Sequence, residues 1–190
     1  MGLLATVLLF SCKNEADKKA DTPTPEISTT KKVEKKVLTP EQSDKVNSLW
    51  RKVSVNGDTK NFIRLLTSAG IADTLLFPSS SFTVFSPSNE SFEVFTERSN
   101  VTNNPAQKEE LVTLLKNHIV VGSMNSTQLV QAVKEDGKVV LTTLTGDKLT
   151  ATMDGNDIML TNETGTTAKV KKTDIKASNG VLHIIDAVLK

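Results

Sequence analysis

Phe82-Thr-Val-Phe-Ser-Pro-Ser-Asn-Glu-Ser-Phe92 and Asn179-Gly-Val-Leu-His-Ile-Ile-Asp-Ala-Val-Leu189 are two apolar boxes that lie far apart in the chain. The first box begins with alternating aromatic and smaller residues, which is typical of a short strand. Ser86 and Pro87 follow as the expected N-cap and first residue of a helix that runs to about Thr96. The first box therefore predicts a strand that turns directly into a helix, and the closing box predicts a final strand.

Helical spacing of apolar residues dominates the region around the first box. Residues 39–50 begin with a threonine, a proline and an acid, which is typical of a helix N-terminus. Residues 59–69 place their apolar side chains on one face, and Gly70 is expected to end that helix in the left-handed conformation. Further helices are expected at residues 108–118 and 126–134, the second of them capped by Ser126.

Beyond Gly137 the apolar pattern changes from helical to alternating, and glycine-containing turns separate short segments. Strands are expected at residues 138–144, 148–153, 157–160, 168–175 and 181–189. Helices gathered before a run of short antiparallel strands indicate an α+β domain, with helices on one side of a β-rich core.

The two boxes, with Asn117-His118-Ile-Val-Val-Gly122 between them, resemble the signature of a fasciclin domain. The resemblance covers about Val46 to Lys190 and implies a wedge-shaped β-sandwich with a helical layer, in which the two boxes lie on neighbouring central strands. Fasciclin domains are extracellular adhesion and binding modules, so the resemblance favours binding over catalysis. It implies structural roles for the motif positions Thr83, Phe85, Pro87, Asn89, His118, Asn179, Gly180, His183 and Asp186.

The N-terminus predicts export and lipid anchoring. Leu3 to Phe10 form an apolar run that is too short to span a bilayer but suits the core of a secretory signal. Leu9-Phe-Ser-Cys12 resembles a bacterial lipobox, whose cysteine is lipidated, although no Lys or Arg precedes the run. The alternative for Cys12 is a free thiol in a tail. We expect a lipoprotein signal peptide at residues 1–12, a flexible polar tether at 13–40 and the fasciclin domain at 41–190.

Composition limits the classes of partner. The net charge of +1 over 190 residues provides no basic field for nucleic acid, which we therefore exclude as a partner. Aromatic residues make up 4% of the chain and tyrosine is absent, so few rings could stack on bases or sugars. The single cysteine excludes an internal disulfide, and packing alone must hold the fold.

His118, His183, Asp186, Asn89 and the serines beside Pro87 supply the residue types of a nucleophilic site. His183 and Asp186 are an odd number of positions apart, however, so on a regular strand they face opposite sides of the sheet. The serines suit caps and turns, and no Gly-rich nucleophile elbow surrounds them. We expect no enzyme activity, buried histidines, and loop-tying roles for Asn89 and Asp186. No pattern predicts a metal site or a cofactor.

The central segment is the expected interaction site if the chain resembles animal fasciclin proteins. In those proteins the segment commonly carries Tyr-His and is implicated in integrin binding. Here Asn117 replaces the tyrosine, which argues against integrin-type recognition. The possible interaction segment consists of Asn117, His118, Ile119 and Val120, although the apolar residues there are better explained as core.

Together these observations predict a non-catalytic binding or adhesion module, exported and lipid-anchored to the bacterial cell envelope, at the outer membrane or cell surface. The expected partners are surface polysaccharide, matrix material or another envelope protein, and only the lipid reaches the membrane. The alternative is a structural or regulatory accessory partner of another envelope protein. A hydrolase is the least favoured class and requires Ser, His and Asp side chains that converge in one cleft. The oligomeric state is left open.

Overall fold

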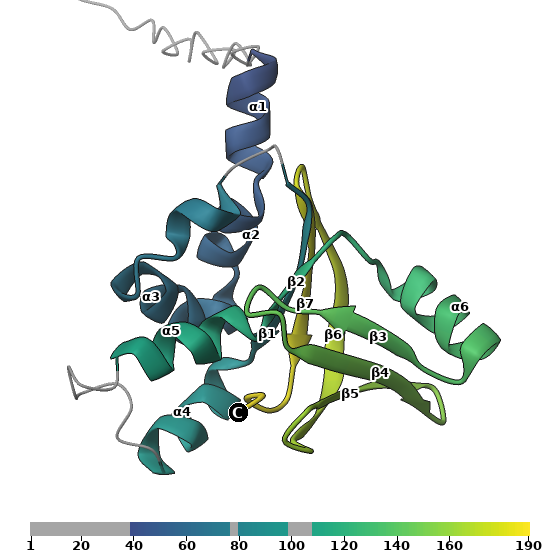
Figure 1. Cartoon of the computed structure of the whole chain (residues 1–190). Coiled ribbons are helices and arrows are strands. Elements are labelled where there is room, and N and C mark those ends of the chain that lie inside the picture. The colour runs from purple at the N-terminus through teal and green to yellow at the C-terminus, as the bar shows by residue number, and fades with distance from the viewer. Residues whose placement is uncertain (1–38, 77–79, 99–107) are drawn as a thin grey trace, which may run out of the picture. The chain divides into compact units, whose positions relative to one another are not determined.

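The computed structural model describes residues 39–76, 80–98 and 108–190, all within one compact unit, Val37–Lys190 (Figure 1). The predicted signal peptide, Cys12 and almost all of the predicted tether lie outside the described residues. The helices are α1 (Pro40–Asn47), α2 (Leu49–Val55), α3 (Lys60–Ser68), α4 (Asn89–Arg98), α5 (Lys108–Lys116) and α6 (Ser126–Asp136). The strands are β1 (Phe82–Pro87), β2 (Ile119–Val121), β3 (Val139–Thr142), β4 (Lys148–Asp154), β5 (Asp157–Asn162), β6 (Thr167–Ala177) and β7 (Gly180–Ile185).

The strands form one mixed sheet in the order β2-β1-β7-β6-β5-β4-β3. The two boxes supply β1 and β7, which pair in parallel with Phe85 opposite His183, while the other pairs are antiparallel. A bridge between Val120 and Thr143 brings the two ends of the sheet together, so the sheet folds over on itself. The predicted α+β class is confirmed, and the boxes lie on neighbouring central strands, as the resemblance implies.

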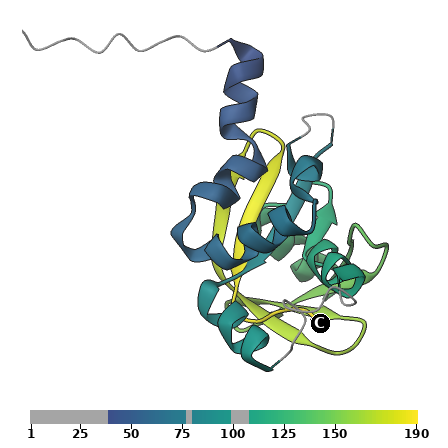
Figure 2. The same ribbon diagram turned by 90° about the vertical axis from the view of Figure 1, so that its left-hand side faces the viewer.

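Two hydrophobic clusters occupy the two faces of the central strands. The first lies between the helical layer and one face of β1 and β7, and includes Val84 and Leu182 (Figure 2). The second lies inside the folded sheet and under α6, and includes Phe85 and Ile185. Because both faces of β1 and β7 are covered, every residue of these strands is buried. This explains why the boxes read as nearly continuous apolar runs.

The single helix expected at residues 39–50 is wrong, because the chain breaks at Ser48. Ser48 has an extended backbone, with ψ of 158°, and separates α1 from α2. Its hydroxyl oxygen accepts a hydrogen bond from the amide of Arg51 at 3.3 Å and so caps α2. The break turns α2 into the core, where Leu49 and Val53 are fully buried, whereas α1 has no buried residue.

The helix start predicted in the first box is also wrong by two residues. Pro87 is still part of β1 and pairs with Ile185, and the amide of Ser88 donates to the Ile185 carbonyl at 2.9 Å. The strand is therefore prolonged by its parallel partner β7. Ser88, rather than Ser86, caps α4, because its hydroxyl accepts from the amide of Ser91 at 3.2 Å.

Two other predicted element ends differ from the structure. Asn125, rather than Ser126, caps α6, in a reciprocal capping box with Gln128 whose two hydrogen bonds are each 2.9 Å long. The closing strand ends at Ile185 rather than Leu189. The end of α3 is confirmed: Gly70 has φ of 73°, and the amide of Ile71 donates to the Leu66 carbonyl at 3.0 Å.

Candidate functional site

His118 is fully buried and both of its ring nitrogens have backbone partners. Nδ1 donates to the Leu114 carbonyl at 2.8 Å, and Nε2 accepts a hydrogen bond from the amide of Leu189 at 3.0 Å. Burial lowers the pKa of His118 to about 4, against the opposing effect of the Leu114 carbonyl. The ring is therefore neutral at physiological pH and ties the C-terminal end of the domain to the end of α5.

His183 is also buried and joins β7 to the start of α6. Its Nε2 donates to the Met124 carbonyl at 3.0 Å, and its Nδ1 accepts from the amide of Asp174 at 3.4 Å. The ring stacks on Phe85, with 5.3 Å between the centroids. Burial lowers the pKa of His183, although the Met124 carbonyl and the Asp174 carboxylate oppose that effect.

Asp174 lies in a bulged part of β6, at the only positive φ, 62°, among the described non-glycine residues. Its carboxylate accepts hydrogen bonds from the Ser126 amide, at 2.8 Å, and from the Ser126 hydroxyl. Partial burial is the largest single influence and opposes ionisation, but the two bonds from Ser126, together with the charges of His183 and Lys176, lower the pKa of Asp174. Ser126, predicted as a helix cap, thus anchors the first turn of α6 to the sheet.

Ser126, Asp174 and His183 lie together, but their arrangement does not suit nucleophilic catalysis. The serine hydroxyl donates to the aspartate, whereas a catalytic serine must face a histidine nitrogen. Both nitrogens of His183, like those of His118, have backbone partners. Among the described residues, no three His, Cys, Asp or Glu side chains come together as a possible metal site.

Asn179 and Gly180 join the closing box to the helical layer. The buried Asn179 side chain accepts from the amide of Leu49 at 2.7 Å and donates to the Leu75 carbonyl at 2.9 Å. Gly180 has φ of 147°, and a Cβ at this position would lie 1.9 Å from the carbonyl oxygen of Phe82. Only glycine fits this close approach between β7 and β1.

Thr83 and Asn89 tie the first box to neighbouring segments. The Thr83 hydroxyl donates to the Gly122 carbonyl at 2.7 Å and accepts from the amide of Met124 at 2.8 Å. The Asn89 side chain accepts from the amide of Asn61 at 3.0 Å and donates to the Gly57 carbonyl at 2.8 Å. These contacts fix the loops on both sides of β1.

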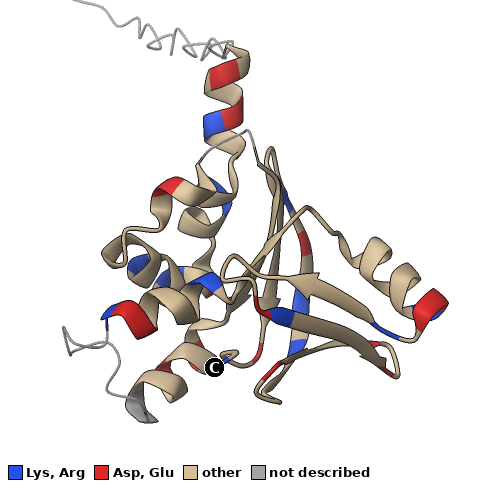
Figure 3. Ribbon diagram, viewed as in Figure 1, with Lys and Arg blue, Asp and Glu red and all other residues tan. Residues whose placement is uncertain are grey.

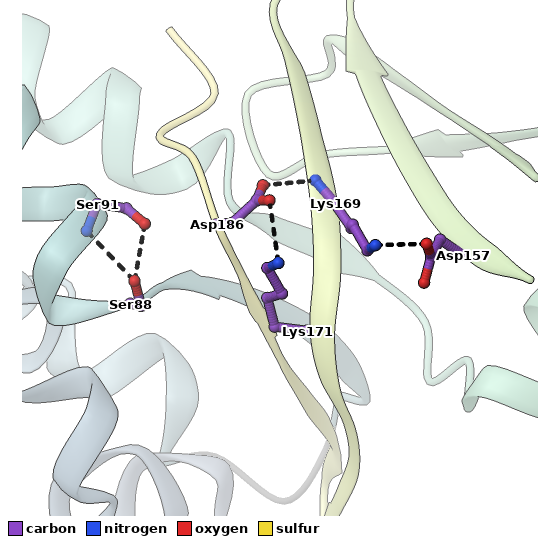
Figure 4. Close-up of polar contacts among 6 residues, drawn as sticks. All are labelled: Ser88, Ser91, Asp157, Lys169, Lys171 and Asp186. Carbon is purple, nitrogen blue, oxygen red and sulfur yellow. Dashed lines mark hydrogen bonds and ion pairs between the residues drawn. The ribbon is translucent and has the colours of Figure 1, made fainter. Parts of the chain in front are cut away.

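Asp186 lies immediately after β7 and is the most exposed of the motif residues. Its carboxylate accepts from the amide of Lys169 at 2.7 Å and lies 3.8 Å from the ammonium group of Lys171 (Figure 4). The two ring nitrogens of His183 instead bond to Met124 and Asp174. Each polar motif residue therefore connects its own segment to a neighbouring one through hydrogen bonds.

The predicted interaction segment is largely inaccessible. His118, Ile119 and Val120 are 0%, 0% and 1% exposed, because β2 is packed between the helical layer and the folded sheet. Asn117 is half-buried, and its side-chain oxygen accepts from the Thr145 hydroxyl. A partner could reach only the edge of this segment, so the structure does not present it as a binding surface.

A groove of about 770 Å³ lies beside the motif residues, between α4 and the β6–β7 pair. Sequence reasoning missed it, although Lys171-Lys172 lies at the first register shift of β6 and could have marked an exposed charged edge. The ionisable residues that line the groove are Asp58, Glu90, Lys171, Lys172, Asp186 and Lys190. Its other lining residues are Ser88, Ser91, Val94, Phe95, Ile184, Ala187 and Val188.

The groove offers both hydrogen-bond donors and acceptors. On the α4 side, the hydroxyl oxygens of Ser88 and Ser91 lie 2.7 Å apart and share a hydrogen bond. Lys171 of β6 and Asp186, just after β7, line the opposite side, where the Asp186 carboxylate is directed toward Lys169 and Lys171 (Figure 4). No histidine lines the groove.

Comparison with known proteins identifies the domain. A family model described as "Fasciclin domain" matches residues 57–190. Protein sll1483 of Synechocystis sp. is 30% identical over 142 residues, which cover 72% of this chain and 71% of that protein. Transforming growth factor-beta-induced protein ig-h3 of Sus scrofa is 30% identical over 130 residues, and periostin of Homo sapiens is 33% identical over 108 residues. These matches cover 67% and 57% of this chain, but only 17% and 12% of those proteins.

A solved structure of a FAS1 domain pair from the insect cell adhesion molecule fasciclin I has the same fold, with a TM-score of 0.63. The match has 17% sequence identity and covers 76% of this chain and 51% of that one. None of the described helices is long and apolar enough to cross a membrane.

Proposed function

This chain belongs to the fasciclin family, and on that premise we propose that it is a non-catalytic binding module of the bacterial cell envelope. The observation that carries the proposal is the contrast between the motif residues and the groove. His118, His183, Asn179 and Thr83 are buried, and they form hydrogen bonds with backbone groups inside the domain. The neighbouring groove instead presents polar side chains to solvent.

The family relationship supports adhesion as the purpose of binding, since the insect relative with the same fold is described as a cell adhesion molecule. The proposed partners are surface polysaccharide, matrix material or another envelope protein. Export and lipidation at Cys12 complete the proposal, because the apolar run before that cysteine resembles a lipoprotein signal. A polar tether would then hold the domain clear of the headgroups.

Binding is best tested with the full chain carrying Cys12→Ser, which cannot be lipidated and can be titrated as a free protein. We expect saturable binding to intact bacterial cells that unlabelled protein competes away. Loss of binding after protease treatment, with no effect of polysaccharide removal, would favour the accessory-partner alternative. A folded protein that shows no saturable binding to any cell sample would sink the adhesion proposal.

Lipidation is tested separately by expressing the unchanged chain in a bacterial host that processes lipoproteins. We expect a membrane fraction whose N-terminal peptide begins at Cys12 and carries acyl chains by mass spectrometry. The Cys12→Ser chain should leave that fraction. An unmodified, unprocessed N-terminus in the wild-type chain would exclude the anchor without affecting the binding proposal.

A further inference from the structure

The walls of the groove differ in chemistry but complement each other. On the α4 side, Ser88 and Ser91 share one hydrogen bond between their hydroxyls, which leaves the second hydroxyl hydrogen available as a donor (Figure 4). Glu90 on the same helix is exposed and adds an acceptor. On the strand side, Lys171 is 53% exposed, and its 3.8 Å separation from Asp186 is longer than a hydrogen bond. Its ammonium group therefore has donors to offer.

The groove carries no net formal charge. Its three lysines, Lys171, Lys172 and Lys190, are balanced by three carboxylates, Asp58, Glu90 and Asp186. Each of these lysines also lies near a carboxylate, in the pairs Lys171–Asp186, Lys172–Asp58 and Lys190–Glu110. The ammonium group of Lys169 is turned away from the serines, toward Asp157 (Figure 4). In Figure 3, the part of β6 that carries Lys169, Lys171 and Lys172 is basic, and Asp174 follows further along the strand. Such a surface does not select a polyanion by its field.

Apolar side chains form part of the groove lining. Ile184 and Val188 are only 2% and 8% exposed, and Ala187, between them in sequence, is half-buried. Val94 at the rim is 43% exposed, and the half-buried ring of Phe95 lies beside it. An apolar strip flanked by donors and acceptors of both kinds matches a sugar ring, which has C–H faces and hydroxyl edges.

We propose that this groove binds a strand of neutral polysaccharide. The inference rests on the proposed function and specifies its ligand. Hydroxyl groups can both donate to Glu90 and Asp186 and accept from Lys171, so one ligand class satisfies both walls. An open groove of about 770 Å³, rather than an enclosed cavity, admits part of a chain that continues beyond it on either side.

The test uses the full chain with Cys12→Ser and an array of immobilised oligosaccharides of neutral, uronate-containing and sulfated types. Ser91→Phe fills the groove from the α4 wall, and Lys171→Ala removes a donor from the other wall. The matched control is Thr127→Phe, which places the same bulk on the exposed first turn of α6, away from the groove. Thermal unfolding of each variant establishes that it is folded.

We expect binding to neutral oligosaccharides that is abolished by Ser91→Phe, weakened about tenfold by Lys171→Ala and unchanged by Thr127→Phe. Binding should change less than about twofold over a tenfold rise in salt. An acidic polysaccharide that neutralised all three lysines would instead lose affinity about a hundredfold over that range, as in counterion release from single-stranded nucleic acid. That result would overturn the proposal for a neutral ligand.

Two other outcomes are decisive. If no oligosaccharide binds a folded protein, the groove is not a carbohydrate site. If wild-type and Ser91→Phe chains bind intact cells equally well, the proposed binding function stands while the groove is excluded as its site. The cell assay and the array thus separate failure of this inference from failure of the proposed function.

Discussion

Protonation of His118 should destabilise the domain in mildly acidic solution. In the folded state Nε2 accepts the amide hydrogen of Leu189, so a proton added there would place two N–H groups against each other and break this bond. Burial lowers the pKa of this histidine from 6.5 to about 4. The unfolded chain therefore takes up a proton near pH 6.5, and the folded chain only near pH 4. The contribution to stability is full above pH 6.5 and is lost as the pH falls from there toward 4.

The magnitude follows from the size of the pKa difference. Complete loss amounts to about 3 kcal/mol, and about 2 kcal/mol of it is lost between pH 7 and pH 5. This is a large share of the free energy of unfolding of a small domain, which is about 5–15 kcal/mol. Because His183 and Asp174 also titrate with lowered pKa values, the wild-type pH dependence alone does not isolate His118.

The assay is urea unfolding of the wild type and of His118→Gln at pH 7 and pH 5, followed by circular dichroism. The glutamine variant should be less stable at pH 7, since it loses the ring that packs edge-on against Phe62, with centroids 5.9 Å apart. Between pH 7 and pH 5, however, it should lose about 2 kcal/mol less than the wild type. The control His183→Gln keeps His118 and should retain that part of the loss.

A direct measurement does not require a stable variant. The ring resonances of His118 in the folded wild-type protein should barely change between pH 7 and pH 5, since only about a tenth of the rings are protonated at pH 5. A titration midpoint near 6.5, or equal pH-dependent losses in the wild type and in His118→Gln, would refute the reasoning from burial.

Three further substitutions test the structural ties by urea unfolding at pH 7. Gly180→Ala should lose more than about 4 kcal/mol of its free energy of unfolding or fail to fold, because its Cβ would lie 1.9 Å from the Phe82 carbonyl oxygen. Gly57→Ala is the control: no atom lies within 4 Å of the new Cβ, and its stability should be nearly unchanged. Equal effects of the two would contradict the close approach. Asn179→Ala removes the partner of the Leu49 amide and of the Leu75 carbonyl, and should lower the free energy of unfolding by about 1–3 kcal/mol for each of these groups. A total change below about 1 kcal/mol would show that water replaces the side chain. Asp186→Asn should change stability by less than about 0.5 kcal/mol, because the exposed ion pair with Lys171 is weak, whereas Asp186→Ala should cost about 1 kcal/mol through loss of the bond from the Lys169 amide. The reverse order would assign the main role to the ion pair.

Much of the fold could be predicted because periodicity and turn chemistry are local. The strands after Gly137 and the end of α3 at Gly70 follow from neighbouring residues alone, and the structure places them close to the expected positions. The errors occur where a distant segment decides a local choice. Ser86 and Ser88 are equally good caps by sequence, and pairing of Pro87 with Ile185 selects the second.

The candidate site was the less predictable part. The apolar residues beside Asn117 were expected to be core, and Ile119 and Val120 are 0% and 1% exposed, so the sequence pointed to no accessible site there. The groove is assembled from α4, β6 and the residues after β7, which lie far apart in the chain. Its residues, such as Ser91 and Lys171, are ordinary surface residues in their own sequence context.

The two boxes and the central segment identify the family, which the match of the fasciclin model supports. The α+β class follows from the apolar patterns, because continuous runs require burial on both faces and alternating runs indicate a sheet. Only the tertiary structure decided which polar groups are available for binding. It gives His118 and Asn179 backbone partners inside the domain and leaves Lys171 and Ser91 beside an open groove. The reason is physical: partners of a hydrogen-bonding group are set by the register between distant strands, and that register exists only in the folded chain.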